Sequence, residues 1–253
     1  MDADRCVSSP CCARHLSLDT ILREYSDIGF RKFEVFLKGG YESGFDYTGD
    51  PEEYRAAGRK YDMEFYSMHL PRITADNFEE SLAESVKCAE FAEKIGAKFM
   101  LFKASDLPTF IKAGRPFLDA VDHLSITPVL QNHFGTPANS LKDIKEILEG
   151  INDPRLKSLL EVGQYHSAGI NWKEAAEYLG DSVVFIHIKD QIGAQSVPFG
   201  TGEVDLHGLF EYMDGRGYDG CYVVEMEVKD RENTMKYLRE AFQFMLEYER
   251  SAS

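Results

Sequence analysis

Short apolar runs alternate with longer amphipathic segments along the chain. The clearest run, 183–190, reads VVFIHIKD, in which four apolar residues lead into His187, Lys189 and Asp190. A run of β-branched and aromatic residues is typical of a strand buried on both faces. Polar residues at its end predict a site at the carboxyl end of the strand, where parallel α/β proteins keep their chemistry. The alternative is a structural histidine beside an ordinary Lys189–Asp190 ion pair.

The same pattern of a strand followed by a helix recurs eight times. The expected strands are 5–9, 32–37, 63–69, 99–103, 127–132, 156–161, 183–190 and 220–225. The expected helices are 17–29, 50–61, 76–96, 107–124, 141–149, 172–179, one from 206, and 234–248. Ser17 predicts a helix N-cap and Gly29 a helix end, Asp76 with Glu79 resembles a capping box, and Gly114 and Pro116 predict an interruption.

Eight such units in 253 residues predict one α/β domain, a (β/α)8 TIM barrel spanning residues 1–253. A doubly wound open sheet shows the same alternation and is the alternative architecture. The two differ in one respect, because only a barrel brings the first and last strands together.

Charge and composition narrow the range of partners. Lys and Arg total 28 against 43 for Asp and Glu, a net charge of −15, which disfavours nucleic acid and anionic membranes as partners. The chain has no run of 18 apolar residues and its N-terminus lacks a signal-peptide pattern, so we expect a cytoplasmic protein. Its five cysteines are an odd, unpatterned set that predicts reduced thiols, and the adjacent Cys11 and Cys12 lack zinc-site spacing.

Polar residues end seven of the expected strands. They are Glu34, His69, Lys103, Gln131, Glu161, His187 and Glu225. In a barrel all would converge on one rim, and the last four would lie within reach of one ion. Carboxylate, imidazole and amide oxygen groups together suit Mn²⁺, Co²⁺, Mg²⁺ or Zn²⁺. The alternative is that Glu161 and Glu225 pair with Lys103 and Lys189.

Seven stretches, in order, resemble the xylose-isomerase-like barrels, a superfamily that includes tagatose and psicose 3-epimerases, hydroxypyruvate isomerase and inosose dehydratase. They are GFRKFEVF, SMHLP, LQNHFGT, LLEVGQYHSAG, FIHIKD, GTGEVDLHGLF and GYDGCYVVE. The resemblance implies a metal held by Glu, Asp, His and Glu at the ends of strands five to eight. It also implies that the two Glu ligands exchange the substrate proton from opposite faces.

Carried over by position, the implied metal ligands are Gln131, Glu161, His187 and Glu225. Gln131 stands where the family has Glu, Glu161 where it has Asp, and Gln164 where a histidine usually follows. An amide oxygen is an uncharged, weaker ligand and cannot act as a general base at neutral pH. The family's two-base mechanism therefore cannot operate unchanged, unless His133 or His166 compensates.

The remaining rim residues are candidates for substrate chemistry. We expect Glu225 and Lys189 to be catalytic, and Glu34, His69, Lys103 and Gln164 to bind substrate. Phe36, Phe102, Phe134, Trp172 and Phe199 are candidate pocket walls. A purely structural role is the alternative for each of them.

The first functional hypothesis is a metal-dependent isomerase or epimerase that acts on a ketose, keto acid or inosose through an enediolate. The second is a metal-dependent lyase or dehydratase with a single base. The third is a non-catalytic sugar-binding barrel, and the fourth a multi-zinc nuclease, which the charge disfavours. The expected partner is a small sugar or sugar derivative, and a homodimer stays open.

Overall fold

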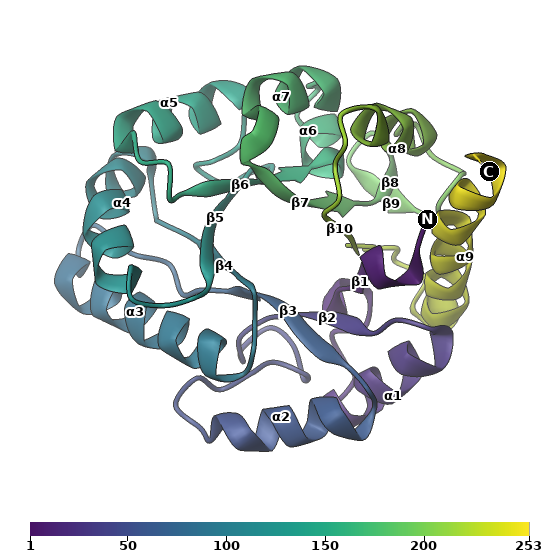
Figure 1. Cartoon of the computed structure of the whole chain (residues 1–253), viewed down its shortest axis with the longest axis horizontal. Helices are drawn as coiled ribbons and strands as arrows, with labels where there is room; N and C mark the ends of the chain where they lie inside the picture. Colours follow the sequence, from purple (N-terminus) through teal and green to yellow (C-terminus); the bar gives the residue numbers. More distant parts are fainter. Residues whose placement is uncertain (253) are drawn as a thin grey trace.

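Eight parallel strands close into a barrel in the computed structural model, which describes residues 1–252 and side chains as far as Tyr248. Figure 1 looks down this barrel, with the strands around the centre and the helices outside. The strands are β1 (Cys6–Ser8), β2 (Lys32–Val35), β3 (Glu64–His69), β4 (Phe99–Phe102), β5 (Thr127–Gln131), β6 (Lys157–Glu161), β7 (Val183–Ile188) and β10 (Cys221–Val224). β1 pairs with β10, with Val7 opposite Val223, which confirms the single-domain TIM barrel and excludes the open sheet.

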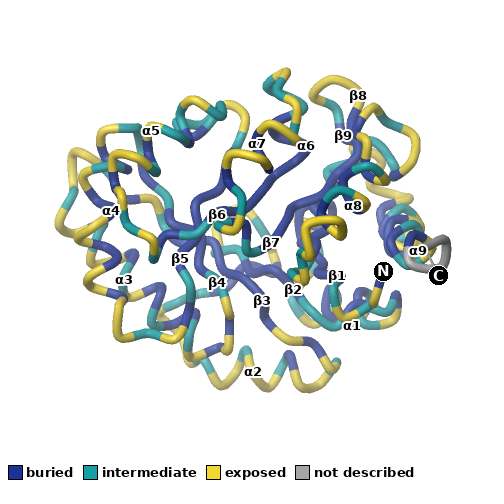
Figure 2. The backbone as a smooth tube through the Cα atoms, turned by 45° about the horizontal axis from the view of Figure 1, so that its top comes forward, coloured by how far each residue is buried: buried dark blue, intermediate teal, exposed yellow. Residues whose placement is uncertain are grey.

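The helices surround the barrel with their apolar sides turned inward. They are α1 (Leu18–Ile28), α2 (Pro51–Lys60), α3 (Phe78–Lys94), α4 (Leu107–Val121), α5 (Leu141–Ile151), α6 (Val162–Ser167), α7 (Trp172–Leu179), α8 (Leu206–Gly215) and α9 (Thr234–Ala252). Short 3-10 helices lie at Ala3–Arg5, Pro10–Cys12, Gly180–Ser182 and Arg231–Asn233. Figure 2 shows the pattern, with buried strands inside and alternating buried and exposed segments along the helices. Among the described residues, no helix is long and apolar enough to cross a membrane.

Two of the predicted helix ends are confirmed, and two other helix predictions are wrong. Ser17 accepts a hydrogen bond from the backbone N–H of Thr20, and Gly29 ends α1 with a φ of 125°. Asp76 is not a cap: α3 begins at Phe78 after Asn77, whose side-chain amide donates to Glu80 instead of capping the backbone. The predicted interruption of the fourth helix is also wrong, because α4 runs without a break past Pro116.

A layer of apolar side chains fills the barrel interior below the rim. This apolar layer consists of Val7, Tyr66, Leu101, Val129, Leu159, Phe185 and Val223. All are 4% exposed or less, so the barrel is solid at this level and has no water-filled channel. The layer therefore forms the floor of any site at the carboxyl ends of the strands.

The expected strand 183–190 ends earlier, and a hairpin that the sequence pattern did not predict follows it. β7 stops at Ile188, and β8 (Asp190–Ile192) pairs with β9 (Gln195–Val197). The buried carboxylate of Asp190 accepts hydrogen bonds from three backbone N–H groups, those of Gln191, Gly202 and Val204. A Cβ atom on Gly202 would lie 2.1 Å from Asp190 Oδ1, so only glycine fits there. Asp190 thus fixes the GTGEVD loop. The alternative prediction of an ion pair between Lys189 and Asp190 is therefore wrong.

Candidate metal centre and substrate cavity

Three buried side chains from adjacent strands meet above the apolar layer. Glu161 ends β6, His187 belongs to β7, and Glu225 follows β10. One ligand atom of each lies within 4.8 Å of the others. His187 Nδ1 is 2.9 Å from Glu161 Oε2 and 3.8 Å from Glu225 Oε2. The strand order β10-β7-β6-β5 therefore assembles the three residues as the sequence pattern predicted.

Gln131, at the end of β5, completes the ring on the fourth strand. Its side-chain Nε2 lies 3.5 Å from His187 Nδ1. Rotation of the amide by 180° would place its oxygen at the same point, so the side chain can present either group. Neighbouring Asn132 exchanges two hydrogen bonds with the backbone of Glu161, at 3.0 and 3.1 Å, and so fixes the ends of β5 and β6 together.

The imidazole of His187 is oriented by a buried carboxylate on the opposite side of the ring. Its Nε2–H donates to Glu34 Oε2 at 3.0 Å, and the Ser67 hydroxyl donates to the same oxygen at 2.8 Å. This bond directs Nδ1 toward Glu161 and Glu225, an arrangement that metal-binding histidines commonly use. Burial opposes a charge on His187, but Glu34, Glu161 and Glu225 outweigh it and raise the pKa of His187 well above its ordinary value.

Two buried carboxylate oxygens in this cluster accept no hydrogen bond of regular geometry: Glu161 Oε1 and Glu225 Oε2. Glu225 Oε2 has the Lys189 ammonium 2.7 Å away, whereas Glu161 Oε1 lies 4.0 Å from the same ammonium. Buried polar atoms in proteins almost always have a partner, so Glu161 Oε1 is the oxygen that a bound cation would satisfy. Burial and the adjacent Glu225 carboxylate raise the pKa of Glu161 to about 7. The donor set of two carboxylates, an imidazole and an amide fits a divalent metal ion.

Lys189 lies beside the same carboxylates and is fully buried. Its Nζ is 2.7 Å from Glu225 Oε2, 3.1 Å from Glu227 Oε2 and 4.0 Å from Glu161 Oε1. The pairing of Glu225 with Lys189 that we considered as an alternative is therefore present. Burial opposes ionisation of Glu225, but Lys189 and His187 outweigh it and hold the pKa of Glu225 well below its usual range.

The lysine stem needs space that one glycine provides. A Cβ atom on Gly163 would lie 2.1 Å from Lys189 Cγ, so no other residue fits beside it. Gly163 is the second residue of α6, directly after Val162. The glycine in the LLEVG stretch therefore belongs to the site, although it contributes no chemical group.

A second chain of contacts leads from His187 to the opposite side of the rim. Glu34 Oε1 lies 3.3 Å from His69 Nε2, and His69 Nδ1 lies 2.7 Å from Lys103 Nζ. The ring of Phe36 stacks on His69 with centroids 3.8 Å apart. Burial, followed by the positive charge of Lys103, lowers the pKa of His69 to about 4. Glu34, in contrast, is kept ionised: burial opposes this, but His187 and His69 lower its pKa to about 2.

A cavity of about 210 Å³ opens above these groups. Six of the strand-end or aromatic residues singled out from the sequence line it: Phe36, His69, Phe102, Lys103, Gln131 and Glu225. Cys11, Arg14, Tyr41, Arg72, His133 and Glu227 complete much of the wall. Glu225 thus belongs both to the buried cluster and to the cavity, whereas Glu161, His187 and Lys189 lie beneath it.

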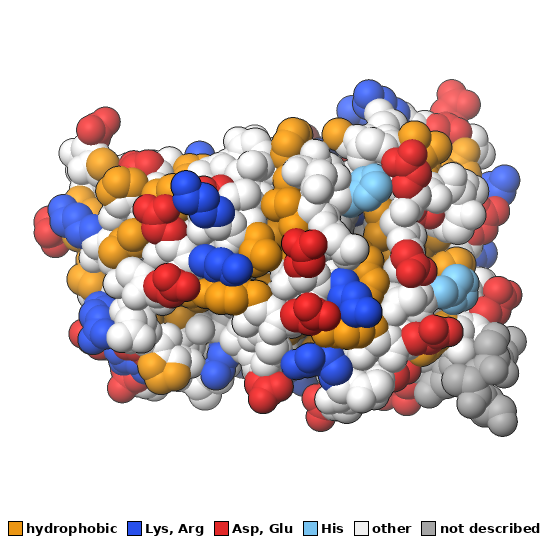
Figure 3. Space-filling view, turned by 90° about the horizontal axis from the view of Figure 1, so that it is seen from above, with side chains coloured by type: hydrophobic (Ala, Val, Ile, Leu, Met, Phe, Trp, Pro, Cys, Tyr) orange, Lys and Arg blue, Asp and Glu red, His pale blue; other side chains and the backbone are white. Residues whose placement is uncertain are grey.

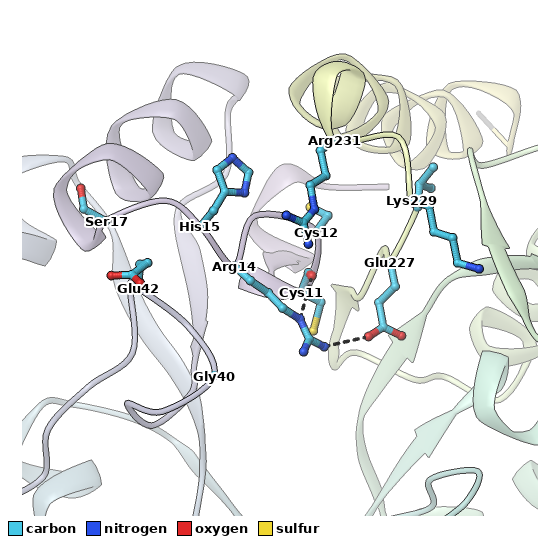
Figure 4. A pocket seen from close by; sticks show the side chains of 11 residues that line it. Cys11, Cys12, Arg14, His15, Ser17, Gly40, Glu42, Glu227, Lys229 and Arg231 are labelled. Carbon is cyan, nitrogen blue, oxygen red and sulfur yellow. Dashed lines mark hydrogen bonds and ion pairs between the residues drawn. The ribbon is translucent and has the colours of Figure 1, made fainter.

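A wider cavity of about 820 Å³ adjoins the first and shares Cys11, Arg14 and Glu227 with it. Figure 4 shows this outer cavity, with Arg14 directed toward Glu227 and Arg231 reaching down from the opposite loop. The Arg14 guanidinium lies 3.2 Å from Glu227 Oε1 and 4.8 Å from the Tyr41 ring centroid. Arg14 and Glu227 therefore form the boundary between the inner and outer cavities.

Several of the predicted site residues lie away from the inner cavity. Gln164 accepts a hydrogen bond from the backbone of Phe134 and lies 3.4 Å from His133, so it supports the loop after β5. His166 pairs with Glu203 at 3.1 Å on a partly exposed edge. Trp172 packs on Tyr212 and Phe199 on Phe244, and Phe134 is 45% exposed. Of the five candidate wall aromatics, only Phe36 and Phe102 line the inner cavity.

Three residues at the site were missed by sequence reasoning. Ser67 lies two residues before His69, and Glu227 lies two residues after Glu225, so strand alternation could have pointed to both. Cys11 follows β1 in a 3-10 helix, and its Sγ lies 3.5 Å from Glu225 Oε1. No periodic pattern marks Cys11, because it lies outside a regular strand.

Comparison with known proteins gives the family. Residues 22–248 match the xylose isomerase-like TIM barrel family. The chain belongs to this family. It is 23% identical over 275 residues to the inosose dehydratase of Mesomycoplasma hyopneumoniae strain 7448, covering 91% of this chain and 88% of that protein. It is 22% identical over 239 residues to the inosose dehydratase of Clostridium perfringens strain 13, covering 77% and 80%.

Solved structures share the fold of this xylose isomerase-like barrel. The IOLI protein with a bound zinc atom superposes with a TM-score of 0.80 at 12% identity, covering 96% of this chain and 97% of that chain. A D-tagatose 3-epimerase-like protein superposes with a TM-score of 0.78 at 14% identity, covering 98% and 100%. At these identities the similarity establishes the architecture, and the chemistry must be argued from the site.

Proposed function

We propose that the protein is a divalent-metal-dependent isomerase or epimerase that acts on a ketose, keto acid or inosose through an enediolate. The observation that supports this most directly is the buried Glu161–His187–Glu225 cluster, in which Glu161 Oε1 accepts no hydrogen bond and Glu225 lines a cavity of about 210 Å³. The wall of this cavity combines charged and polar side chains with aromatic and other apolar ones, a lining that suits a small sugar derivative.

Glu161, His187 and Glu225 would hold the ion, with Gln131 as a weaker fourth ligand. When bound, such an ion polarises a carbonyl group and stabilises the negative charge of an enediolate. Mn²⁺, Co²⁺, Mg²⁺ and Zn²⁺ are the ions to test, and the zinc in the IOLI structure supports including the last. The IOLI similarity does not select among the four ions.

Glu225 is the residue that we assign as the base. It lines the cavity, and Lys189 together with His187 keeps its carboxylate ionised, so it can accept a proton from a C–H group beside a carbonyl. The buried Lys189 ammonium contributes positive charge 2.7 Å from that carboxylate. Lys103 and His69 face the same cavity; Lys103 would hydrogen-bond a hydroxyl group of the substrate, and His69 holds the Lys103 amine in position.

Dehydration is the second candidate function. Gln131 replaces the carboxylate that would act as the opposite base, and an amide cannot accept a proton at neutral pH. A site with one carboxylate base is suited to removing a proton while a neighbouring hydroxyl leaves as water. The similarity to inosose dehydratases over most of the chain supports this candidate.

Nuclease activity is not expected. A multi-zinc nuclease needs several ligand groups, and Glu161, His187 and Glu225 are the single group of this kind in the described residues. On the face shown in Figure 3, acidic and basic side chains are interspersed and form no continuous basic band. With a net charge of −15, we expect no retention of duplex DNA in a gel shift at physiological salt and no nicking of abasic DNA.

The test of the proposed function is proton NMR in D₂O with a panel of ketoses, keto acids and inososes and the Mn²⁺-loaded protein. We expect deuterium to enter one position beside the carbonyl and Glu225→Gln to slow this exchange about 10²–10⁴-fold. Glu232→Gln, an exposed residue on the loop that follows β10, is the matched control and should exchange at the wild-type rate. Exchange that survives in Glu225→Gln assigns the base elsewhere. Absence of exchange with every compound would favour a sugar-binding role.

A further inference from the structure

Lys103 and Glu225 lie on opposite sides of the barrel mouth. The closed order of the strands is β1-β10-β7-β6-β5-β4-β3-β2, so β4 is the fourth strand from β10 in either direction. Glu225 follows β10, Lys103 follows β4, and both side chains line the cavity of about 210 Å³. A small molecule in this cavity therefore lies between a carboxylate and an amine.

A neighbouring side chain holds the amine of Lys103 in place, but does not occupy all of its N–H donors. Its one hydrogen bond, among the side chains that the structure describes, is with His69 Nδ1 at 2.7 Å. An ammonium group carries three N–H donors, so two are left for a ligand. His69 cannot swing away, because Phe36 stacks on its ring and Glu34 lies 3.3 Å from its other nitrogen.

We propose that Lys103 is the second proton-transfer group of this site and acts on the substrate face opposite Glu225. The inference rests on the proposed function and extends it, because Lys103 would supply the second proton-transfer group that the Gln131 amide cannot provide. Gln131 lies on β5, which pairs with β4 in the barrel, so Lys103 lies one strand away from it.

Two proton transfers make up the proposed reaction. Glu225 takes a proton from the carbon beside the carbonyl, the C–H bond breaks, and its electron pair passes to the carbonyl oxygen as an enediolate forms. In an epimerisation Lys103 gives a proton to the opposite face of that carbon. In an elimination it gives the proton to the departing hydroxyl, which leaves as water while a C=C bond forms. Glu225 then returns its proton to water, and the Lys103 amine takes one up.

The surroundings of Lys103 suit a group that gives and regains a proton. Loss of hydration lowers the pKa of Lys103 to about 8, an effect that Arg72 reinforces and that Glu34, Glu225 and Cys11 partly offset. The other ionisable groups around the cavity are Arg14, Tyr41, His69, His133 and Glu227. A pKa near the working pH favours proton transfer in both directions. His69 is less suitable, because its pKa is about 4, its Nδ1 bonds to Lys103 and its Nε2 lies 3.3 Å from Glu34 Oε1.

The decisive experiment separates exchange from turnover. With whichever compound of the panel reacts, Lys103→Met should keep the deuterium exchange that Glu225 catalyses, whereas net epimerisation or elimination falls at least about 100-fold. Lys103→Arg keeps the positive charge but cannot release a proton near neutral pH, so it should fail equally. Lys98→Met, at an exposed position directly before the same strand, is the matched control and should retain both activities.

The outcomes distinguish the two proposals. Equal loss of exchange and turnover in Lys103→Met, or full rescue by Lys103→Arg, would show that Lys103 only binds the substrate or supports the fold. Loss of exchange in Glu225→Gln together with normal turnover in Lys103→Met would leave the proposed function intact and overturn the role of Lys103. The wild-type rate should also show a titration near pH 8 that Lys103→Gln lacks.

A measurement without substrate serves if the variants do not fold. Wild-type protein is labelled with acetic anhydride across a pH series, and acetylation of each lysine is quantified by mass spectrometry, with Lys98 as the internal reference. We expect Lys103 to titrate at about 8. A midpoint at the ordinary lysine value of about 10.4 would overturn the proposal, because the group would then hold its proton too firmly.

Discussion

The apolar layer and the layer of chemical groups above it are built from the same strands, one pleat apart. Five strands place an apolar residue in the lower layer and a polar residue two positions later in the upper one: Leu101 and Lys103, Val129 and Gln131, Leu159 and Glu161, Phe185 and His187, Val223 and Glu225. Two residues advance a strand by about 6.6 Å. Across that distance the barrel interior changes from a packed hydrophobic core to a cluster of ionised groups.

The difference shows how the barrel can carry buried charge. An isolated buried carboxylate is costly, but Glu34, Glu161 and Glu225 each have His187 within 4.0 Å, and Lys189 adds a second cation beside two of them. The apolar layer beneath keeps water from entering through the other end of the barrel. The pairing of opposite charges in the upper layer and the dense packing of the apolar layer are therefore separate features, and substitutions can test each of them.

The largest effect is expected in the apolar layer. Phe185 is fully buried and its ring packs against Tyr66 and Phe99, with centroids 5.7 and 5.1 Å away. Phe185→Ala should lower the free energy of unfolding by about 3–5 kcal/mol, because it removes a large side chain and leaves a cavity. Urea denaturation measures this. Tyr178→Ala, a large aromatic residue that is 37% exposed, is the control and should cost much less.

The next effect concerns the orientation of His187. Glu34→Gln leaves the side-chain shape but replaces the charged acceptor of the His187 Nε2–H bond, which is 3.0 Å long. We expect affinity for Mn²⁺ to fall about 10–100-fold, the usual range for the partner of a metal-binding histidine. Isothermal titration calorimetry measures it, with Glu232→Gln as the unchanged control. Affinity equal to wild type would mean that Glu34 does not orient the ligand.

Metal binding should also depend on pH. Without an ion the pKa of His187 is raised by the surrounding carboxylates and that of Glu161 is about 7, so both groups bind protons near neutral pH. An ion needs both groups deprotonated, so binding releases protons and affinity falls as pH falls, by up to about tenfold per pH unit for each proton released. Calorimetry in buffers of different ionisation enthalpy counts the protons. A pH-independent affinity between pH 6 and 8 would contradict the assignment of these ligands.

The smallest expected effect is a gain in metal affinity. Gln131→Glu adds a negative charge next to His187, where the amide nitrogen now lies at 3.5 Å. We expect Mn²⁺ to bind up to about tenfold more tightly, because carboxylate charge tunes the affinity of oxygen-ligand sites. Resistance to a chelator, followed by elemental analysis, gives the comparison, and Gln131→Met should weaken binding. If neither substitution changes the affinity, Gln131 does not face the ion.

The sequence was sufficient for the fold and for the centre of the site. Alternation of apolar runs and amphipathic segments gave all eight barrel strands, and the polar residue at the end of each strand gave Glu161, His187 and Glu225. Both results depend on local periodicity, which a sequence displays directly. The same logic failed at Asp76, where a plausible cap pattern lies one residue before the actual N-cap, and at 183–190, where Asp190 starts a hairpin.

Only the tertiary structure decided which groups contact one another. Lys189 and Asp190 are neighbours in sequence, yet Lys189 pairs with Glu225 and Glu227 while Asp190 holds the loop at Gly202. Glu34 and His187 are 153 positions apart and share a hydrogen bond, and Cys11 reaches Glu225 from an irregular segment. Closure of the barrel decides these contacts, and it also places Lys103 across from Glu225. Periodicity determines which way a side chain points, but only the assembled barrel determines what it meets.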